Sequence, residues 1–144
     1  MKKTLFFIAF LLCTTFHYGQ NKTVIGKWKT IDDVTGQAKS ILEIYEKSGK
    51  INGKVIEILD LKHKKSLCNN CEGEYKDKPI LGLVVIKGLV KKGDQYGSGK
   101  IIDPTNGNIY KCYISLVTND KLKIRGYIGI SLFGRTQYWH RVKE

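Results

Sequence analysis

The sequence predicts an all-β domain that closes into an antiparallel up-and-down barrel of about eight strands. Short runs rich in Ile, Val, Leu and Tyr recur along the chain, and turn-forming residues such as Asn, Asp and Gly separate them. No stretch keeps a helical period of about 3.6 residues for three turns. A sandwich of two sheets is the alternative, because strands of this kind build both architectures.

The expected strands, in chain order, cover residues 24–31, 39–46, 51–59, 80–90, 95–102, 108–118, 121–130 and 136–142. Most are separated by short turn signals, namely Thr35-Gly36, Ser48-Gly49, Gly93-Asp94, Asn106-Gly107, Asn119-Asp120 and Phe133-Gly134. Asn106-Gly107 predicts a type I′ hairpin turn, because both residues tolerate positive φ. Residues 62–79 are the exception and form a long polar loop.

The runs 108–118 and 121–130 alternate apolar side chains with lysine, arginine, tyrosine and serine. A strand with one apolar and one polar face belongs to an antiparallel sheet with its core on one side. Closure of such a sheet into a barrel leaves no open edge. The interior of an eight-stranded barrel is either filled by side chains or holds one small ligand. Candidate residues to line a ligand there are Tyr110, Ile114, Ile124 and Ile128.

The chain has 144 residues, with 25 lysines and arginines against 13 acids, which gives a formal charge of +12. This length allows one domain, expected over residues 21–144. The lysines fall in loops such as residues 62–65, or on polar strand faces such as that of Lys121, Lys123 and Arg125. They are not interleaved with aromatic residues as in a stacking platform for nucleic acid. We therefore expect no nucleic-acid partner, and an anionic surface fits the charge better.

The first twenty residues read as a signal peptide. Lys2 and Lys3 precede an apolar run over residues 5–13, and small or polar residues follow up to Gly19 and Gln20, near which cleavage is expected. The run is shorter than the ~20 residues that span a bilayer, and no later segment of the sequence is long and apolar enough to cross one. A lipid anchor on Cys13 is the alternative, disfavoured by the bulky Leu12 before it. The mature protein is expected to be exported, either periplasmic or secreted.

The pattern Cys68-Asn69-Asn70-Cys71 lies in the long polar loop. Redox catalysis by such a pair needs a strand-to-helix setting, which this loop lacks. A zinc site would have to combine both cysteines with two ligands from His63, Cys112 and a carboxylate, without the usual second pair of ligands. An oxidising compartment favours a structural disulfide instead. We expect a Cys68–Cys71 bridge, a buried free thiol at Cys112, and no metal or other cofactor.

No motif for catalysis is present in the sequence. His63 lies in a cationic run without a neighbouring acid to orient it, and His140 lies on the last strand, facing away from Trp139. There is no phosphate-binding glycine loop and no HExxH helix. No catalytic residue is therefore assigned, and an enzyme is not the favoured reading.

The first and last strands carry a paired pattern. Gly26-Lys27-Trp28 opens the first strand, and Trp139-His140-Arg141 lies in the last. This pairing resembles the calycin superfamily of lipocalins, fatty-acid-binding proteins and avidins. The resemblance implies that the Trp28 indole packs across the barrel floor beneath Arg141, or beneath Arg135 in its place, as a cation–π pair. The structural residues would then be Gly26, Trp28 and Arg141. The alternative is two ordinary core tryptophans.

The whole mature chain also resembles a more specific group, an uncharacterised family of small secreted bacterial proteins known as domain of unknown function 2147. The residues that carry the resemblance include Gly26-Lys27-Trp28, Cys68-x-x-Cys71, Lys78-Pro79-Ile80-Leu81-Gly82, Asp103-Pro104 with Asn106-Gly107, Tyr110-Lys111-Cys112, and Phe133-Gly134-Arg135. No activity is established for this family, so it implies no catalytic residues.

These observations favour an exported binding module for a small apolar ligand or an envelope component, held at a barrel mouth rimmed by residues 62–79. A structural or interaction protein of the cell envelope that uses a basic surface is the alternative. A secreted enzyme with an unrecognised site is the third hypothesis.

Overall fold

The structure is a computed structural model that describes residues 22–143. The expected signal peptide, its cleavage site and Cys13 lie outside the described residues.

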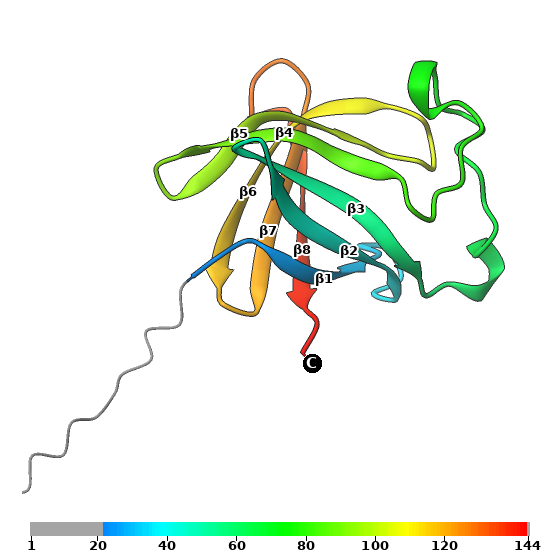
Figure 1. The fold of residues 1–144 in the computed structure, drawn as a ribbon, viewed down its shortest axis with the longest axis horizontal. Coiled ribbons are helices and arrows are strands. Elements are labelled where there is room, and N and C mark those ends of the chain that lie inside the picture. The colour runs from blue at the N-terminus through cyan, green and yellow to red at the C-terminus, as the bar shows by residue number, and fades with distance from the viewer. Residues whose placement is uncertain (1–21, 144) are drawn as a thin grey trace, which may run out of the picture.

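Eight antiparallel strands form a closed barrel in which neighbours in sequence are neighbours in the sheet and the last strand pairs with the first (Figure 1). The strands are β1 (Gly26–Ile31), β2 (Ala38–Lys47), β3 (Lys50–Ile58), β4 (Val84–Lys92), β5 (Gln95–Ile102), β6 (Ile109–Thr118), β7 (Lys121–Tyr127) and β8 (Gly134–Arg141). Two short 3₁₀ turns, η1 (Leu61–His63) and η2 (Gly73–Tyr75), lie between β3 and β4. The predicted up-and-down barrel is confirmed, and the sandwich is excluded.

Two strand predictions extended too far. Residues 80–83 belong to the loop before β4, and residues 128–130 belong to the loop after β7. In both places the apolar residues continue beyond the end of the strand. Tyr127 is the last residue of β7 in the ladder, opposite Gly134. Alternation along one chain does not reveal where the partner strand ends, because that depends on register.

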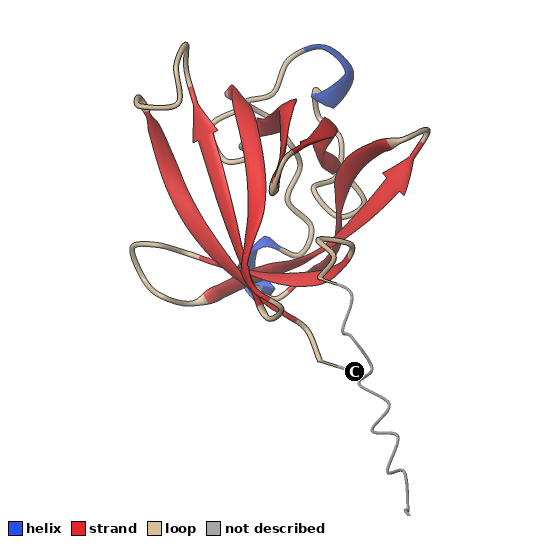
Figure 2. Ribbon diagram, turned by 90° about the vertical axis from the view of Figure 1, so that its left-hand side faces the viewer, coloured by secondary structure: helices blue, strands red, loops and turns tan. Residues whose placement is uncertain are grey.

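The two ends of the barrel differ in their connections (Figure 2). At the turn end, residues 48–49, 93–94 and 119–120 join strands tightly. Ser48 and Gly49 both have positive φ, 52° and 73°, as a two-residue hairpin turn of type I′ requires. At the long-loop end lie residues 32–37, 59–83, 103–108 and 128–133.

The interior of the barrel is occupied by side chains from every strand. Fully buried residues include Trp28 on β1, Ile44 on β2, Ile86 and Leu89 on β4, and Ile114 on β6. Leu122, Ile124 and Trp139 complete the core from β7 and β8. Close packing of this kind is what fills a small barrel in the absence of a ligand.

The seam between β1 and β8 is closed at the turn end by Arg141. Its Cζ lies 4.1 Å from the centroid of the Trp28 ring, and Trp28 is completely buried. The guanidinium donates hydrogen bonds to the carbonyl oxygens of Thr23 (2.6 Å) and Ile25 (3.0 Å), and its Nε to that of Asn119 (2.6 Å). Arg141 therefore ties the N-terminal segment, the β6–β7 turn and the indole together. Arg135, the substitute that the resemblance allowed, pairs with Asp33 instead.

Gly26 is required beside this arginine. Its φ is +134°, a region that residues with a side chain rarely adopt, and a Cβ there would lie 2.7 Å from Nη1 of Arg141. This explains why glycine precedes the tryptophan by two positions.

The Cys68–Cys71 disulfide is confirmed, and Cys112 is a buried free cysteine. The bridge lies in the core, with both cysteines buried, so the long polar loop contributes to the core. The loop also packs against residues 103–108. Asn70 donates from Nδ2 to the carbonyl of Thr105 (3.0 Å), and a Cβ on Gly107 would collide with the Asn70 carbonyl. Asp103 and Asn108 bound this wider loop, which replaces the predicted type I′ turn.

We expect Gly26→Ala to lower the free energy of unfolding by about 3 kcal/mol, because it combines a strained backbone with displacement of Arg141. Gly36→Ala is the matched control, since Gly36 also has positive φ, +70°, but has no atom within 4 Å of the new Cβ. Its cost is about 1 kcal/mol, from the backbone alone. Urea unfolding of both variants measures the difference, and equal costs would contradict the role given to Arg141.

Thiol labelling distinguishes the three cysteines. Burial raises the pKa of the Cys112 thiol to about 12, so at about pH 8 it is neutral, buried and unreactive. With maleimide, we expect no labelled residue among Cys68, Cys71 and Cys112 in the folded protein. Unfolding exposes Cys112 alone, and unfolding with a reductant exposes all three, as mapped by peptide mass spectrometry. Labelling of Cys68 and Cys71 without reductant would refute the bridge.

Candidate functional site

The four residues predicted to line a ligand are separated by the structure. Ile114 and Ile124 are fully packed in the core, opposite each other on β6 and β7. Tyr110 is half-buried near the long-loop end, and its hydroxyl accepts a hydrogen bond from Nδ2 of Asn108 (3.3 Å). The two isoleucines would meet a ligand only if the packed core opened.

Ile128 is not an interior residue. It lies beyond the end of β7, and 69% of its surface is exposed. The Ile128 N–H donates to the Phe133 carbonyl (3.0 Å), which closes the loop between β7 and β8. Its exposure places it in a group of loop residues at the long-loop end.

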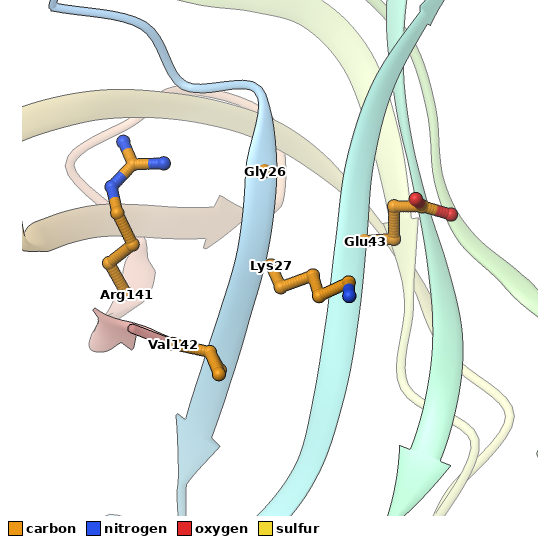
Figure 3. Close-up of a pocket in the computed structure, with 5 residues that line it drawn as sticks. All are labelled: Gly26, Lys27, Glu43, Arg141 and Val142. Atoms are coloured by element: carbon orange, nitrogen blue, oxygen red, sulfur yellow. The ribbon is translucent and has the colours of Figure 1, made fainter. Parts of the chain in front are cut away.

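Two hollows stand out on residues 22–143, and both lie along the outer surface of the β1–β8 seam. β1 and β8 pair through Trp28 opposite Arg141 and Lys29 opposite His140, and they diverge on either side. The hollow at the turn end is lined by Gly26, Lys27, Glu43, Arg141 and Val142 (Figure 3). In Figure 3, Lys27 and Arg141 extend to opposite sides of β1. Arg141 in this hollow donates hydrogen bonds to three carbonyl groups and so closes the barrel. The hollow is therefore part of the structure that closes the β1–β8 seam.

The second hollow lies toward the long-loop end. It is lined by Ile31, Asp33, Thr136, Gln137, Tyr138 and His140. A chain of hydrogen bonds leads from it to the core. The indole N–H of Trp139 donates to Oε1 of Gln137 (3.3 Å), and the Gln137 amide donates to Asp33 (2.8 Å). Arg135 binds the other oxygen of Asp33, and this hydrogen bond raises the pKa of its guanidinium.

The positive charge is concentrated in one half of the sequence. Residues 84–143 contain eleven lysines and arginines and three acids, Asp94, Asp103 and Asp120, which all lie in turns or loops. Residues 22–83 contain twelve lysines and arginines and nine acids. Strands β4 to β8 therefore carry no carboxylate at all.

The outer face of β5 to β8 interleaves cations with tyrosines, contrary to the prediction from sequence. Tyr113 lies opposite Arg125, Lys111 opposite Tyr127, and Lys123 opposite Tyr138. We call this surface the basic tyrosine face, composed of Lys100, Lys111, Tyr113, Lys121, Lys123, Arg125, Tyr127, Tyr138 and His140. Its tyrosines come from three strands, so only register reveals the mixture.

Cations lie directly over rings on this face. The Lys121 ammonium is 4.6 Å from the centroid of the Tyr138 ring, and that of Lys123 is 5.7 Å from the Tyr113 ring. The Tyr113 and Tyr127 rings are 6.3 Å apart. Lysine stems that lie along aromatic rings keep the ammonium groups at the surface, where they can meet an anion.

Most of the exposed large apolar residues lie at the long-loop end of the barrel. Nine of the twelve belong to the connections there or to the first residue of β6. They are Val34, Leu61, Leu67, Leu81, Ile109, Ile128, Ile130, Leu132 and Phe133. A surface enriched in this way marks a site of interaction.

His63 does have an acidic partner, which corrects the prediction. Its Nδ1 lies 2.7 Å from Oδ2 of Asp60, and this hydrogen bond is the main cause that lowers the pKa of the Asp60 carboxyl. Asp60 also accepts from the Lys62 N–H as the N-cap of η1. The pair is exposed and caps a short helical turn, which is a structural role.

Cys68 and Cys71 are bonded to each other, and a disulfide has no thiolate to offer to a metal ion. Across residues 22–143, no three side chains of His, Cys, Asp or Glu are grouped so that they could hold a metal ion. None of the helices in this part of the chain is long and apolar enough to span a membrane.

Comparison with known proteins finds a solved structure with a similar barrel. The structure is similar to that of protein HP1028 from the human pathogen Helicobacter pylori, which belongs to the lipocalin family, with a TM-score of 0.75 and 20% sequence identity. The match covers 85% of this chain and 84% of that one. At this identity the likeness shows a shared lipocalin-like fold. No curated protein matches the chain.

Residues 26–141 match the model of a family described as "Uncharacterized protein conserved in bacteria (DUF2147)". The matched segment begins at the glycine beside Arg141 and ends at Arg141 itself, so it contains the whole barrel. The chain therefore belongs to this family of uncharacterised bacterial proteins, domain of unknown function 2147, and has a lipocalin-like barrel.

Proposed function

We propose that the protein is an exported binding module that holds an anionic component of the cell envelope on the outside of its barrel. The observation that carries this proposal is the basic tyrosine face, a sheet surface of cations and aromatic rings without a carboxylate in its strands. The character of residues 1–20 and the Cys68–Cys71 disulfide support export.

The packed interior favours binding outside the barrel over binding within it. Ile114, Leu122 and Trp28 are completely buried among other side chains, so an internal ligand would have to displace them. Closely packed side chains leave no room that a ligand could take without a rearrangement. The outer face needs no such change.

A polyanion suits this face in two ways. Exposed ammonium groups attract repeated negative charges, and the attraction weakens as salt screens it. Tyrosine rings offer flat apolar surface and hydroxyl groups to the ring or chain that carries the charges. Single anions would be held weakly by such an open surface, whereas an extended anion reaches several cations at once.

We expect Lys121→Gln/Lys123→Gln to weaken binding to soluble dextran sulfate at low salt by about 30-fold, since each cation near an anionic surface contributes about 1 kcal/mol. Lys47→Gln/Lys50→Gln is the matched control, because it removes the same charge from exposed lysines beside the β2–β3 turn. Its affinity is expected to stay within about twofold of wild type. Isothermal titration calorimetry across a salt series measures both. Equal losses in the two variants would reduce the effect to net charge and refute the site.

A small apolar ligand is the second candidate, favoured by the hollow beside Asp33 and Gln137 at the long-loop end of the lipocalin-like barrel. A molecule there would contact Tyr138 and the hydrogen-bond chain that leads to Trp139. Native mass spectrometry of protein purified from its own cells tests this candidate. We expect a retained adduct, if there is one, to disappear in Gln137→Ala, and repeated absence of any adduct removes the candidate.

A further inference from the structure

The loop between β7 and β8 displays four large apolar side chains to solvent. Exposed fractions are 69% for Ile128, 60% for Ile130, 73% for Leu132 and 68% for Phe133. The two remaining residues of this loop, 128–133, are Gly129 and Ser131, so it carries no charge. Exposure of this much apolar surface in one short segment is unfavourable in water and typical of a surface that meets an apolar phase or partner.

Hydrogen bonds hold this loop in a defined shape. The Phe133 N–H donates to the Ile130 carbonyl (3.1 Å), closing a turn inside the loop. Arg125 on β7 donates from Nε to the Ser131 carbonyl (2.7 Å) and from Nη2 to the Leu132 carbonyl (3.1 Å). The apolar side chains are therefore presented outward by a braced backbone, in which the carbonyl groups of residues 129–133 all accept hydrogen bonds.

Cations lie immediately behind the apolar tip. The Lys111 ammonium donates to the Gly129 carbonyl (3.3 Å), and the Arg125 guanidinium lies under residues 131 and 132. Both belong to the basic tyrosine face, which continues from the loop along β6 and β7. Tyr127, the last residue of β7, adjoins the loop, and tyrosine is favoured at the boundary between lipid and water.

This arrangement matches an anionic bilayer better than a protein partner. An apolar segment backed by lysine and arginine suits the lipid interface, where acyl chains receive the apolar groups and anionic headgroups meet the cations. A protein partner would need a pocket shaped for a protruding loop, whereas a fluid bilayer accepts one without a preformed shape. In Figure 1 the loop, drawn in orange, projects beyond the strands that it joins.

We propose that residues 128–133 insert into the headgroup region of a bilayer that contains anionic lipid, with Ile128, Ile130, Leu132 and Phe133 as the inserted groups. Lys111 and Arg125 then lie at the level of the headgroups. This inference rests on the proposed function, and it names the anionic envelope component as membrane lipid.

Phe133→Trp in the full protein reports insertion directly. Trp28 and Trp139 are buried in the core, so a change in emission on binding comes from the new indole. With vesicles of phosphatidylcholine and phosphatidylglycerol, we expect a shift of emission to shorter wavelength and quenching by brominated acyl chains. Vesicles of phosphatidylcholine alone are expected to give a weaker response. No shift and no quenching with the anionic vesicles would overturn the proposal.

Ile130→Ser/Leu132→Ser is expected to lower the affinity for the same anionic vesicles at least about tenfold in a co-sedimentation assay, through loss of buried apolar surface. Ile25→Ser/Val117→Ser is the matched control, because both residues are exposed away from the long-loop end, and its vesicle binding should equal that of wild type. Unchanged thermal midpoints exclude misfolding. Insertion would be overturned if the loop variant bound vesicles as wild type does. It would also be overturned if the wild-type protein did not bind vesicles but formed a dimer that the loop variant abolishes.

Dextran sulfate separates this inference from the proposed function. The loop variant should bind dextran sulfate as wild type does, because its cations are intact. Loss of that binding in Lys121→Gln/Lys123→Gln tests the basic tyrosine face alone. Insertion is supported if Ile130→Ser/Leu132→Ser loses binding to vesicles but still binds dextran sulfate. The proposed function fails if Lys121→Gln/Lys123→Gln binds both vesicles and dextran sulfate as wild type does.

Discussion

The contact of Arg141 with Trp28 closes the barrel at the seam between β1 and β8. β1 and β8 pair through two opposed residue pairs, so the backbone ladder contributes little to this seam. The guanidinium replaces the missing ladder, because its several donors satisfy carbonyl groups of the N-terminal segment and of the β6–β7 turn while its face covers the indole. Gly26 permits that approach, since any side chain there would displace the arginine. One cation thus completes both the hydrogen bonding and the packing of this end.

Because the barrel is closed and side chains fill its interior, the proposed binding takes place on its outer surface. Closure brings β5 to β8 into a fixed register, and register alone places the tyrosines of β6 among the cations of β7. The same register ends β7 at Tyr127 and leaves residues 128–133 to project beyond the sheet. The basic tyrosine face and the apolar loop are therefore two products of one packing arrangement. Together they form a surface with charge on its side and apolar groups at its tip, as an anionic interface requires.

Features that depend on neighbouring residues in the chain could be predicted, and features that depend on pairing could not. The strands, the Cys68–Cys71 bridge and the paired pattern of Gly26 to Trp28 are legible in short segments. Ile128 was assigned to the interior because it continues the alternation of β7, but its strand ends one residue earlier. Asp60 lies three residues before His63, a spacing that brings the two side chains together in a helical turn. This signal was missed because the sequence shows no helical period. The mixture of cations and tyrosines escaped prediction because its members lie on different strands.

The antiparallel strands and the bridged cysteines could be predicted from the sequence, because alternation, turn residues and cysteine spacing act over a few neighbouring positions. The closing residues and the family followed from a resemblance that short motifs carry. Only the tertiary structure decided that the interior is filled, that the disulfide belongs to the core and that an apolar loop stands beside a basic face. The physical reason is that burial and register are set by residues distant in the chain: whether Ile124 lies in a core and Ile128 in water depends on where β8 begins.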